Sequence, residues 1–197
     1  GTLGIPEFGT GFVQGMLQDT MPKTMEELIR ISGLSHGTDV WLSNAQDLIQ
    51  SGTAKLAECF CTRDDIMNFL IGKGVDFKAS FDIMERVRKG RGLTPEMEQT
   101  MRDKQVPQWA IESCQKIKYM FPRSHAAAYV IMALRVAWYK VHEPLSYYAA
   151  YFSVRADGFD AGSMLVPMQA VRERIKVFLT RDDRMTPTEE REKNALH

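Results

Sequence analysis

The sequence predicts an all-α fold of about seven to nine helices around a central, buried, apolar helix. Three observations support this prediction. Thr24, Thr62 and Thr94 each precede a run of apolar residues with helical spacing, and a threonine in that position can cap a helix. The stretch from Ala126 to Val141 is apolar on nearly every side, which is typical of a buried helix. No segment alternates apolar and polar residues in the way that a half-buried strand does.

The first two predicted helices have clear start and stop signals. Thr24 and Glu27 have the spacing of a capping box, and Gly33 supplies the stop of the helix that follows them. Thr62 begins a second helix with two aspartates in its first turn, and this helix ends near Gly72.

Two more helices follow at short intervals. One starts near Phe77 and stops at Gly90. The next has Thr94 as its cap and Pro95 as its first residue, a position where proline fits the helical backbone without losing a hydrogen bond.

The fifth predicted helix opens at Pro107 and runs to Phe121, where Pro122 must break it. Ser124 is then expected to cap the long central helix. The cations and aromatics just before Ser124 would therefore lie at a joint between two helices.

Beyond the central helix, Pro144 starts an aromatic helix that carries Tyr147 and Tyr148. Residues 171–179 form one more predicted helix. The charge-rich tail from Thr180 is expected to be frayed or disordered.

The formal net charge of the 197 residues is zero, but the charge is unevenly distributed. Residues 1–70 carry nine acids against four Lys or Arg, and residues 86–123 carry nine Lys or Arg against four acids. The second segment predicts a basic surface that suits phosphate groups. The three cysteines have neither a disulfide framework nor zinc spacing, so they are predicted to be reduced and structural.

The longest apolar run, from Ala126 to Leu134, is too short to cross a membrane. The chain has no initiator methionine at Gly1 and no signal peptide. It is therefore expected to be a piece of a larger cytoplasmic protein with no membrane partner.

The most informative stretch is residues 116–129, KIKYMFPRSHAAAY. Lys118 and Arg123 can neutralise phosphate oxygens, Tyr119 offers a face on which a base can stack, and His125 adds a further polar ring. Together they indicate a site for a nucleotide or for the end of a nucleic acid. The alternative is an ordinary corner between core helices, with solvated lysines and a structural histidine.

Two other places extend this candidate site. Arg63 could reach a triphosphate, although a surface ion pair explains it equally well. His36 lies in a loop of small residues that permits a ligand to approach the backbone, and a turn that caps the next helix is its alternative explanation.

Four cations lie close to Gly90 and predict contacts with a phosphate backbone. Arg86, Arg88 and Lys89 precede this glycine, and Arg91 follows it. Cations also stabilise the end of a helix, and Glu85 can pair with Lys89. Both explanations can hold together.

Asp64 and Asp65 do not predict a metal site. Adjacent residues on a helix point about 100° apart, so their carboxylates cannot easily share one ion. Their place after Thr62 favours interactions with the N-terminus of the helix instead.

Six strings resemble the fingers region of C-family bacterial replicative DNA polymerases, and within that family the PolC-type DNA polymerase III alpha subunit of low-GC Gram-positive bacteria. They occur in the order of that family and are residues 4–10 (GIPEFGT), 31–41 (ISGLSHGTDVW), 63–67 (RDDIM), 88–98 (RKGRGLTPEME), 116–129 (KIKYMFPRSHAAAY) and 147–152 (YYAAYF). The resemblance divides the chain into a fingers domain, residues 1–158, and a helical extension with a charged tail, residues 159–197.

The resemblance implies a nucleotidyltransferase that uses Mg²⁺ in DNA replication. Its metal-binding aspartates would belong to the palm, outside this chain, so no catalytic or metal-binding residue is expected here and the isolated chain should be inactive. Implied partners are primer-template DNA, dNTP, the palm and thumb domains, and a sliding clamp reached through other parts of the enzyme. The implied dNTP-binding residues are Arg63, Lys118, Tyr119, Arg123, His125 and His36, and the implied DNA-binding residues are Arg86, Arg88, Lys89 and Arg91.

A second hypothesis is a non-enzymatic helical module that binds nucleic acid or serves as a scaffold. It explains the basic segment without a nucleotide pocket. The two hypotheses differ in whether Arg63, Lys118, Arg123 and His125 converge on one concave surface.

Overall fold

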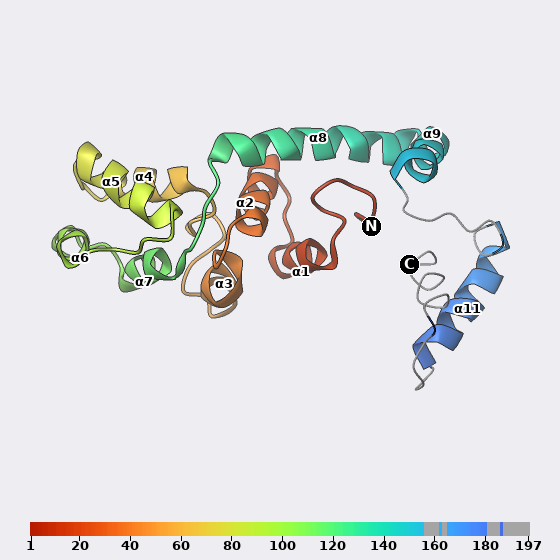
Figure 1. Cartoon of the computed structure of the whole chain (residues 1–197), viewed down its shortest axis with the longest axis horizontal. Helices are drawn as coiled ribbons and strands as arrows, with labels where there is room; N and C mark the ends of the chain where they lie inside the picture. Colours follow the sequence, from red (N-terminus) through yellow and green to blue (C-terminus); the bar gives the residue numbers. More distant parts are fainter. Residues whose placement is uncertain (156–161, 163–164, 181–185, 187–197) are drawn as a thin grey trace. The chain divides into compact units, whose positions relative to one another are not determined.

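The computed structural model describes residues 1–155, 162, 165–180 and 186 of the chain. Within these residues the secondary structure is helical and includes no strand, as Figure 1 shows. The same residues contain one isolated β-bridge, between Thr38 and Tyr119. The all-α prediction is therefore confirmed.

The described residues form ten α-helices and two π-helical turns. In chain order they are α1 (Gly11–Thr20), α2 (Met25–His36), η1 (Trp41–Ala45), α3 (Gln46–Gln50), α4 (Arg63–Gly72), α5 (Phe77–Arg88), α6 (Pro95–Asp103), α7 (Gln108–Lys116), α8 (Arg123–His142), α9 (Pro144–Ala150), η2 (Tyr151–Arg155) and α11 (Met168–Thr180).

This count exceeds the expected seven to nine helices because two helical regions have weak sequence signals. Two glycines in α1 weaken its helical signal. The second region, from η1 through α3, is interrupted by the left-handed backbone of Ser43, with φ of 57°, so it has no continuous helical period.

The three threonine caps are confirmed. Thr24 Oγ1 accepts a hydrogen bond from the Glu27 main-chain N–H at 3.2 Å, and a Glu27 carboxylate oxygen accepts one from the Thr24 N–H at 2.9 Å. Thr62 and Asp65 form a second capping box. Thr94 Oγ1 accepts from the Met97 N–H at 3.3 Å.

Two boundaries near the informative stretch were predicted wrongly. Helix α7 ends at Lys116 rather than near Phe121, because the residues that follow it bond to other segments of the chain. Helix α8 begins at Arg123, and its first N–H donates to an Asp64 carboxylate oxygen at 2.7 Å. A residue of α4 therefore takes the capping place that was expected of Ser124.

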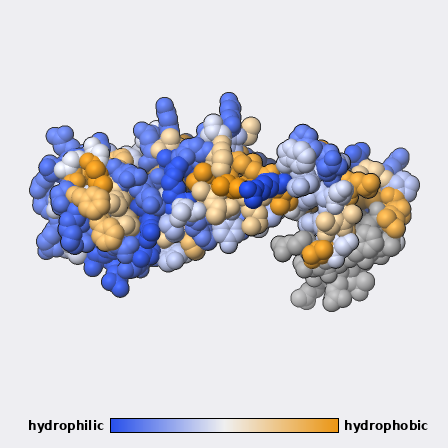
Figure 2. All heavy atoms as spheres, turned by 90° about the horizontal axis from the view of Figure 1, so that it is seen from above, coloured by the Kyte–Doolittle hydropathy of each residue, from blue (hydrophilic) through white to orange (hydrophobic). Residues whose placement is uncertain are grey.

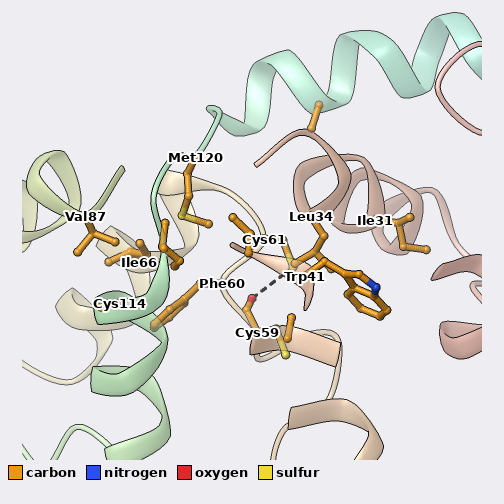
Figure 3. Packing of buried hydrophobic residues seen from close by; sticks show 14 of the residues in the cluster. Ile31, Leu34, Trp41, Cys59, Phe60, Cys61, Ile66, Val87, Cys114 and Met120 are labelled. Carbon is orange, nitrogen blue, oxygen red and sulfur yellow. Dashed lines mark hydrogen bonds between the residues drawn. The ribbon is translucent and has the colours of Figure 1, made fainter. Parts of the chain in front are cut away.

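The chain divides into two compact units, Gly1–Ala137 and Trp138–His197. The first unit holds a continuous hydrophobic core, part of which Figure 3 shows around Phe60, Cys61 and Met120. All three cysteines are free and buried, as expected of reduced, structural residues. Burial raises the pKa of the Cys114 thiol to about 12, so this thiol is unreactive.

Helix α8 is not the central buried helix that its composition predicted. Its buried residues are Ala126, Val130 and Ala133, whereas the Met132 side chain is 55% exposed and that of Leu134 is 41% exposed. Figure 2 looks onto α8 from above and shows apolar atoms at the surface there. One stripe of small residues packs on the core and the larger apolar side chains face outward.

Helix α9 and η2 bring several aromatic rings together, and the ring centroids of Tyr147 and Tyr148 are 5.0 Å apart. The predicted helix at residues 171–179 is confirmed as part of α11. Most of the tail that was expected to be disordered lies outside the described residues.

Candidate nucleotide and DNA interface

The segment between α7 and α8 is extended and is held by main-chain hydrogen bonds from two directions. The Lys118 N–H donates to the Thr38 carbonyl oxygen at 3.0 Å, and the Thr38 N–H donates to the Tyr119 carbonyl oxygen at 3.0 Å. The Met120 N–H donates to the Arg88 carbonyl oxygen at 3.2 Å. In Figure 1 the segment accordingly passes between α2 and the pair of helices α4 and α5. Its main-chain hydrogen bonds thereby link the residue Thr38, just after α2, to Arg88 at the end of α5, and these two residues are distant in sequence.

The start of α4 fixes the far end of the same segment. The Arg63 N–H donates to the Phe121 carbonyl oxygen at 3.1 Å, and Asp64 accepts from the first N–H of α8, that of Arg123. The first N–H groups of α4 and α8 have no partner within their own helices, and these tertiary contacts supply one for each. The backbone that carries Lys118 and Tyr119 is therefore rigidly placed.

Two glycines permit this close approach of backbones. A Cβ atom at Gly90 would lie 2.3 Å from the Lys118 carbonyl oxygen, and the φ of Gly90 is +70°. A Cβ atom at Gly37 would lie 2.8 Å from the Tyr119 carbonyl oxygen and 2.3 Å from Val40 Cγ2. Both sites exclude any larger residue unless the backbone shifts.

One carboxylate, that of Glu85, gathers three cations. It forms a two-pronged hydrogen bond with Arg88, whose Nη2 lies 2.9 Å from Oε2. Lys89 Nζ lies 2.9 Å from Oε2, and Arg63 Nη1 lies 3.6 Å from Oε1. The hydrogen bonds from Arg88 and Lys89 lower the pKa of Glu85 to about 2. The predicted pair of Glu85 with Lys89 is confirmed, and Arg63 joins it from α4.

Arg123 is also engaged inside the domain. Its guanidinium pairs with Glu26 of α2, and its Nη1 lies 4.0 Å from Asp65 Oδ1. The hydrogen bond from Arg123 lowers the pKa of the Glu26 carboxyl below its usual value. Arg30 contacts the same two carboxylates, at 3.1 Å and 3.7 Å. This network ties α8 to α2 and α4.

An aromatic cluster surrounds the two predicted histidines. The His125 ring stacks on Phe121 with centroids 4.5 Å apart, and the His36 ring meets the His125 ring edge-on at 5.4 Å. Tyr129 contacts both histidines, with centroids 4.6 Å from His125 and 5.4 Å from His36. Tyr119 packs edge-on against Phe121 at 4.9 Å. Tyr119 is therefore supported, through Phe121, by one network of packed rings.

His36 is held at both ring nitrogens. Its Nδ1 lies 2.6 Å from the Ser32 carbonyl oxygen, and its Nε2 lies 2.7 Å from a Glu7 carboxylate oxygen. His36 is the last residue of α2, so the predicted stop at Gly33 and the predicted loop at His36 are wrong. The helix keeps a glycine at position 33 because a Cβ atom there would lie 2.5 Å from the Cys61 carbonyl oxygen. His36 therefore belongs to the packed part of the cluster and links α2 to the N-terminal loop.

Several predicted residues keep exposed side chains. Lys118 and Arg91 are exposed, and in the described part of the chain neither forms an ion pair. Tyr119 is 41% exposed. Arg86 Nε is buried, and no atom of the described residues accepts a hydrogen bond from it.

The structure thus brings the predicted residues together in two groups. Arg63 joins Arg88 and Lys89 at Glu85, while His36 and His125 join Tyr119 through Phe121 (distances above). Arg123 lies in neither group and binds Glu26 instead.

Little in the sequence indicates the residues that organise these two groups. Glu85 had one signal, its spacing from Lys89, and nothing in the sequence indicated its contact with Arg63. Glu7 had no signal, because only folding brings the N-terminal loop to His36.

The two adjacent aspartates are each bonded at the N-terminus of a helix. Asp65 accepts hydrogen bonds from the N–H groups of Cys61 and Thr62, whereas Asp64 bonds Arg123. In the part of the chain that the structure describes, no group of three acidic, histidine or cysteine side chains could hold a metal ion. Asp64 and Asp65 are therefore occupied by main-chain N–H groups and do not form a metal site together. Likewise, no helix of the described residues meets the length and hydropathy of a membrane span.

Relatives with high identity cover nearly the whole chain. A protein called DNA polymerase III PolC-type from Staphylococcus saprophyticus is 58% identical over 92% of the chain, which corresponds to 13% of that protein. Proteins of the same name from Thermotoga maritima and Bacillus subtilis are 59% and 60% identical over 89% and 87% of the chain. The chain spans 13% and 12% of their respective lengths. The model of the bacterial DNA polymerase III alpha subunit finger domain matches residues 1–107. The resemblance seen in the sequence strings is thus confirmed, and the chain belongs to the family of bacterial DNA polymerase III alpha subunit finger domains.

Proposed function

We propose that this chain is the fingers part of a replicative DNA-directed DNA polymerase and that it contacts the incoming dNTP and the primer-template DNA. One observation carries the proposal. The extended segment before α8 carries an exposed cation, Lys118, and next to it in sequence an exposed aromatic ring, Tyr119, on a backbone fixed by Thr38 and Arg88. A nucleotide needs both a cation for its phosphates and a face for its base.

The predicted dNTP-binding residues then have different roles. Lys118 neutralises the triphosphate and Tyr119 stacks on the base pair being formed. His36 and His125 support Tyr119 through Phe121. Arg63 and Arg123 already pair with carboxylates, so they contact phosphate only when it displaces those partners.

The DNA backbone is assigned to the basic residues around Gly90. Arg88 and Lys89 lie at the end of α5, where cations also complement the helix dipole. Arg91 follows Gly90 with an exposed side chain. Arg86 completes the set.

The reaction we propose for the whole protein is in-line transfer of a nucleotidyl group to a primer. Mg²⁺ would be held by carboxylates outside this chain and would supply charge neutralisation at the reacting phosphate. The residues of this chain would orient the triphosphate, exclude water and hold the template base pair. The other proposed partners are the palm and thumb domains and, through other parts of the enzyme, a sliding clamp, all in the cytoplasm. We further propose that the fingers span residues 1–158 and that residues 159–197 form an extension.

A non-enzymatic module that binds nucleic acid or serves as a scaffold is the second candidate. The ion pairs of Arg63 and Arg123 favour it, because cations already neutralised inside the domain can be purely structural.

We expect the isolated chain to be unable to extend a primer, with Mg²⁺ or without it. The reason is that Asp64 and Asp65 are both bonded at helix N-termini, and that the described residues contain no group of three potential metal ligands. The measurement is primer extension by the purified chain. Metal-dependent incorporation that disappears in Asp64→Asn or Asp65→Asn would contradict this expectation.

Arg91→Ala in the intact polymerase should weaken duplex binding and flatten its dependence on salt. Loss of one phosphate contact reduces the slope of log K against log salt by about 0.9. Binding is measured by fluorescence anisotropy of a labelled primer-template at several salt concentrations. Lys55→Ala, an exposed cation outside the basic segment, is the control and should leave the slope unchanged. An unchanged slope in Arg91→Ala would remove Arg91 from the DNA interface.

A further inference from the structure

The arrangement around Glu85 is unusual for an ordinary surface ion pair. Three positive side chains, Arg63, Arg88 and Lys89, share one carboxylate, so two positive charges remain in excess. All four side chains are partly exposed, from 21% for Glu85 to 42% for Lys89. An anion from solution can therefore reach the cluster.

Glu85 lies at an unfavourable position on its helix. It lies in the last turn of α5, which ends at Arg88, and a negative charge there is disfavoured by the helix dipole. The contacts with the three cations, rather than helix formation, therefore account for its place. A carboxylate offers the same kind of oxygen acceptor to Arg and Lys that a phosphate does.

We propose that Glu85 is a built-in substitute for phosphate, which holds Arg63, Arg88 and Lys89 together until a phosphate group displaces it. This inference rests on the proposed function and adds to it that these cations form one anion site rather than two. The resemblance instead implies that Arg63 binds the dNTP and that Arg88 and Lys89 bind DNA. The low pKa of Glu85 agrees with the proposal, because the carboxylate stays ionised and competes with phosphate.

The two sources of phosphate, a nucleotide and the DNA backbone, are separated by two probes on the intact polymerase. One probe is inorganic tripolyphosphate, measured by calorimetry, and the other is a primer-template duplex without nucleotide, measured by anisotropy. Glu85→Gln keeps the shape of the side chain and removes its charge. It should tighten binding of one or both probes by roughly threefold to tenfold, because phosphate no longer has to displace a charged competitor. Tighter binding of tripolyphosphate alone assigns the site to the nucleotide. Tighter binding of the duplex alone assigns it to DNA.

Asp82→Asn is the matched control, because Asp82 lies on the same helix and pairs with the single cation Lys78. It should change neither affinity. Adding Arg88→Ala to Glu85→Gln should abolish the increase in affinity that Glu85→Gln causes. Thermal melting of each variant checks that the domain stays folded.

If Glu85→Gln binds both probes as the wild type does, or more weakly, the substitute role is overturned and Glu85 merely organises the end of α5. That result would leave the proposed function standing, since Lys118 and Arg91 test it and neither contacts Glu85 among the described residues.

Discussion

Lys118→Ala is expected to lower the catalytic efficiency of the intact polymerase roughly tenfold to a hundredfold, and equally for all four dNTPs. A cation responds to phosphate charge and not to the identity of the base. Its loss removes a charge-assisted hydrogen bond worth about 1.5–3 kcal/mol in a desolvated site. Steady-state incorporation of each dNTP opposite its template base measures the effect.

Lys116→Ala is the matched control for this substitution. Its ammonium donates to the Ser43 carbonyl oxygen at 2.7 Å, so its role is structural. It should affect catalytic efficiency only as far as it affects stability. If Lys118→Ala also loses efficiency only in step with its melting temperature, the segment is a core corner and the nucleotide role is wrong.

Tyr119→Ala extends the same experiment to the base. A stacking ring makes a larger contact with a purine than with a pyrimidine, so the loss should differ between them and misincorporation should change. A uniform loss over all four dNTPs would indicate that Tyr119 positions the segment through Phe121 instead.

Gly90→Ala is expected to destabilise the domain by about 3 kcal/mol. Two effects add. The left-handed backbone of Gly90, with φ of +70°, strains any residue that has a Cβ atom. That atom would also lie 2.3 Å from the Lys118 carbonyl oxygen, which is main chain and cannot turn away. Urea unfolding of the chain, followed by tryptophan fluorescence, measures the loss.

Gly74→Ala separates the two effects. Gly74 has a similar φ of +80°, but a Cβ atom there would meet nothing within 4 Å. Its cost should be the strain alone, about 1–2 kcal/mol. Equal costs at both glycines would show that the contact with Lys118 is easily relaxed.

The predicted helix starts at Thr24, Thr62 and Thr94 were correct because capping depends on residues three positions apart. The predicted end of α7 was wrong because it depends on Thr38 and Arg88, whose backbones bond the following residues and hold them extended. Rules for helix starts and ends use residues that are close in sequence, so they cannot predict partners that only folding brings near.

The candidate site shows the same limit. The sequence strings identified the residues of the family and the kinds of side chain at the site. They could not indicate that Glu85 unites Arg63 with Lys89, or that Glu7 holds His36. Composition likewise predicted a buried α8, whereas Met132 and Leu134 are exposed.

The sequence by itself determined the all-α class, the main caps and the family, because these follow from short-range spacing and from the residues themselves. Only the tertiary structure decided where residues 117–122 run and which cations are left exposed. The physical reason is that main-chain hydrogen bonds and ion pairs choose their partners by distance in space. For Tyr119 and Thr38, or Arg63 and Glu85, that distance is set by the packing of the helices between them.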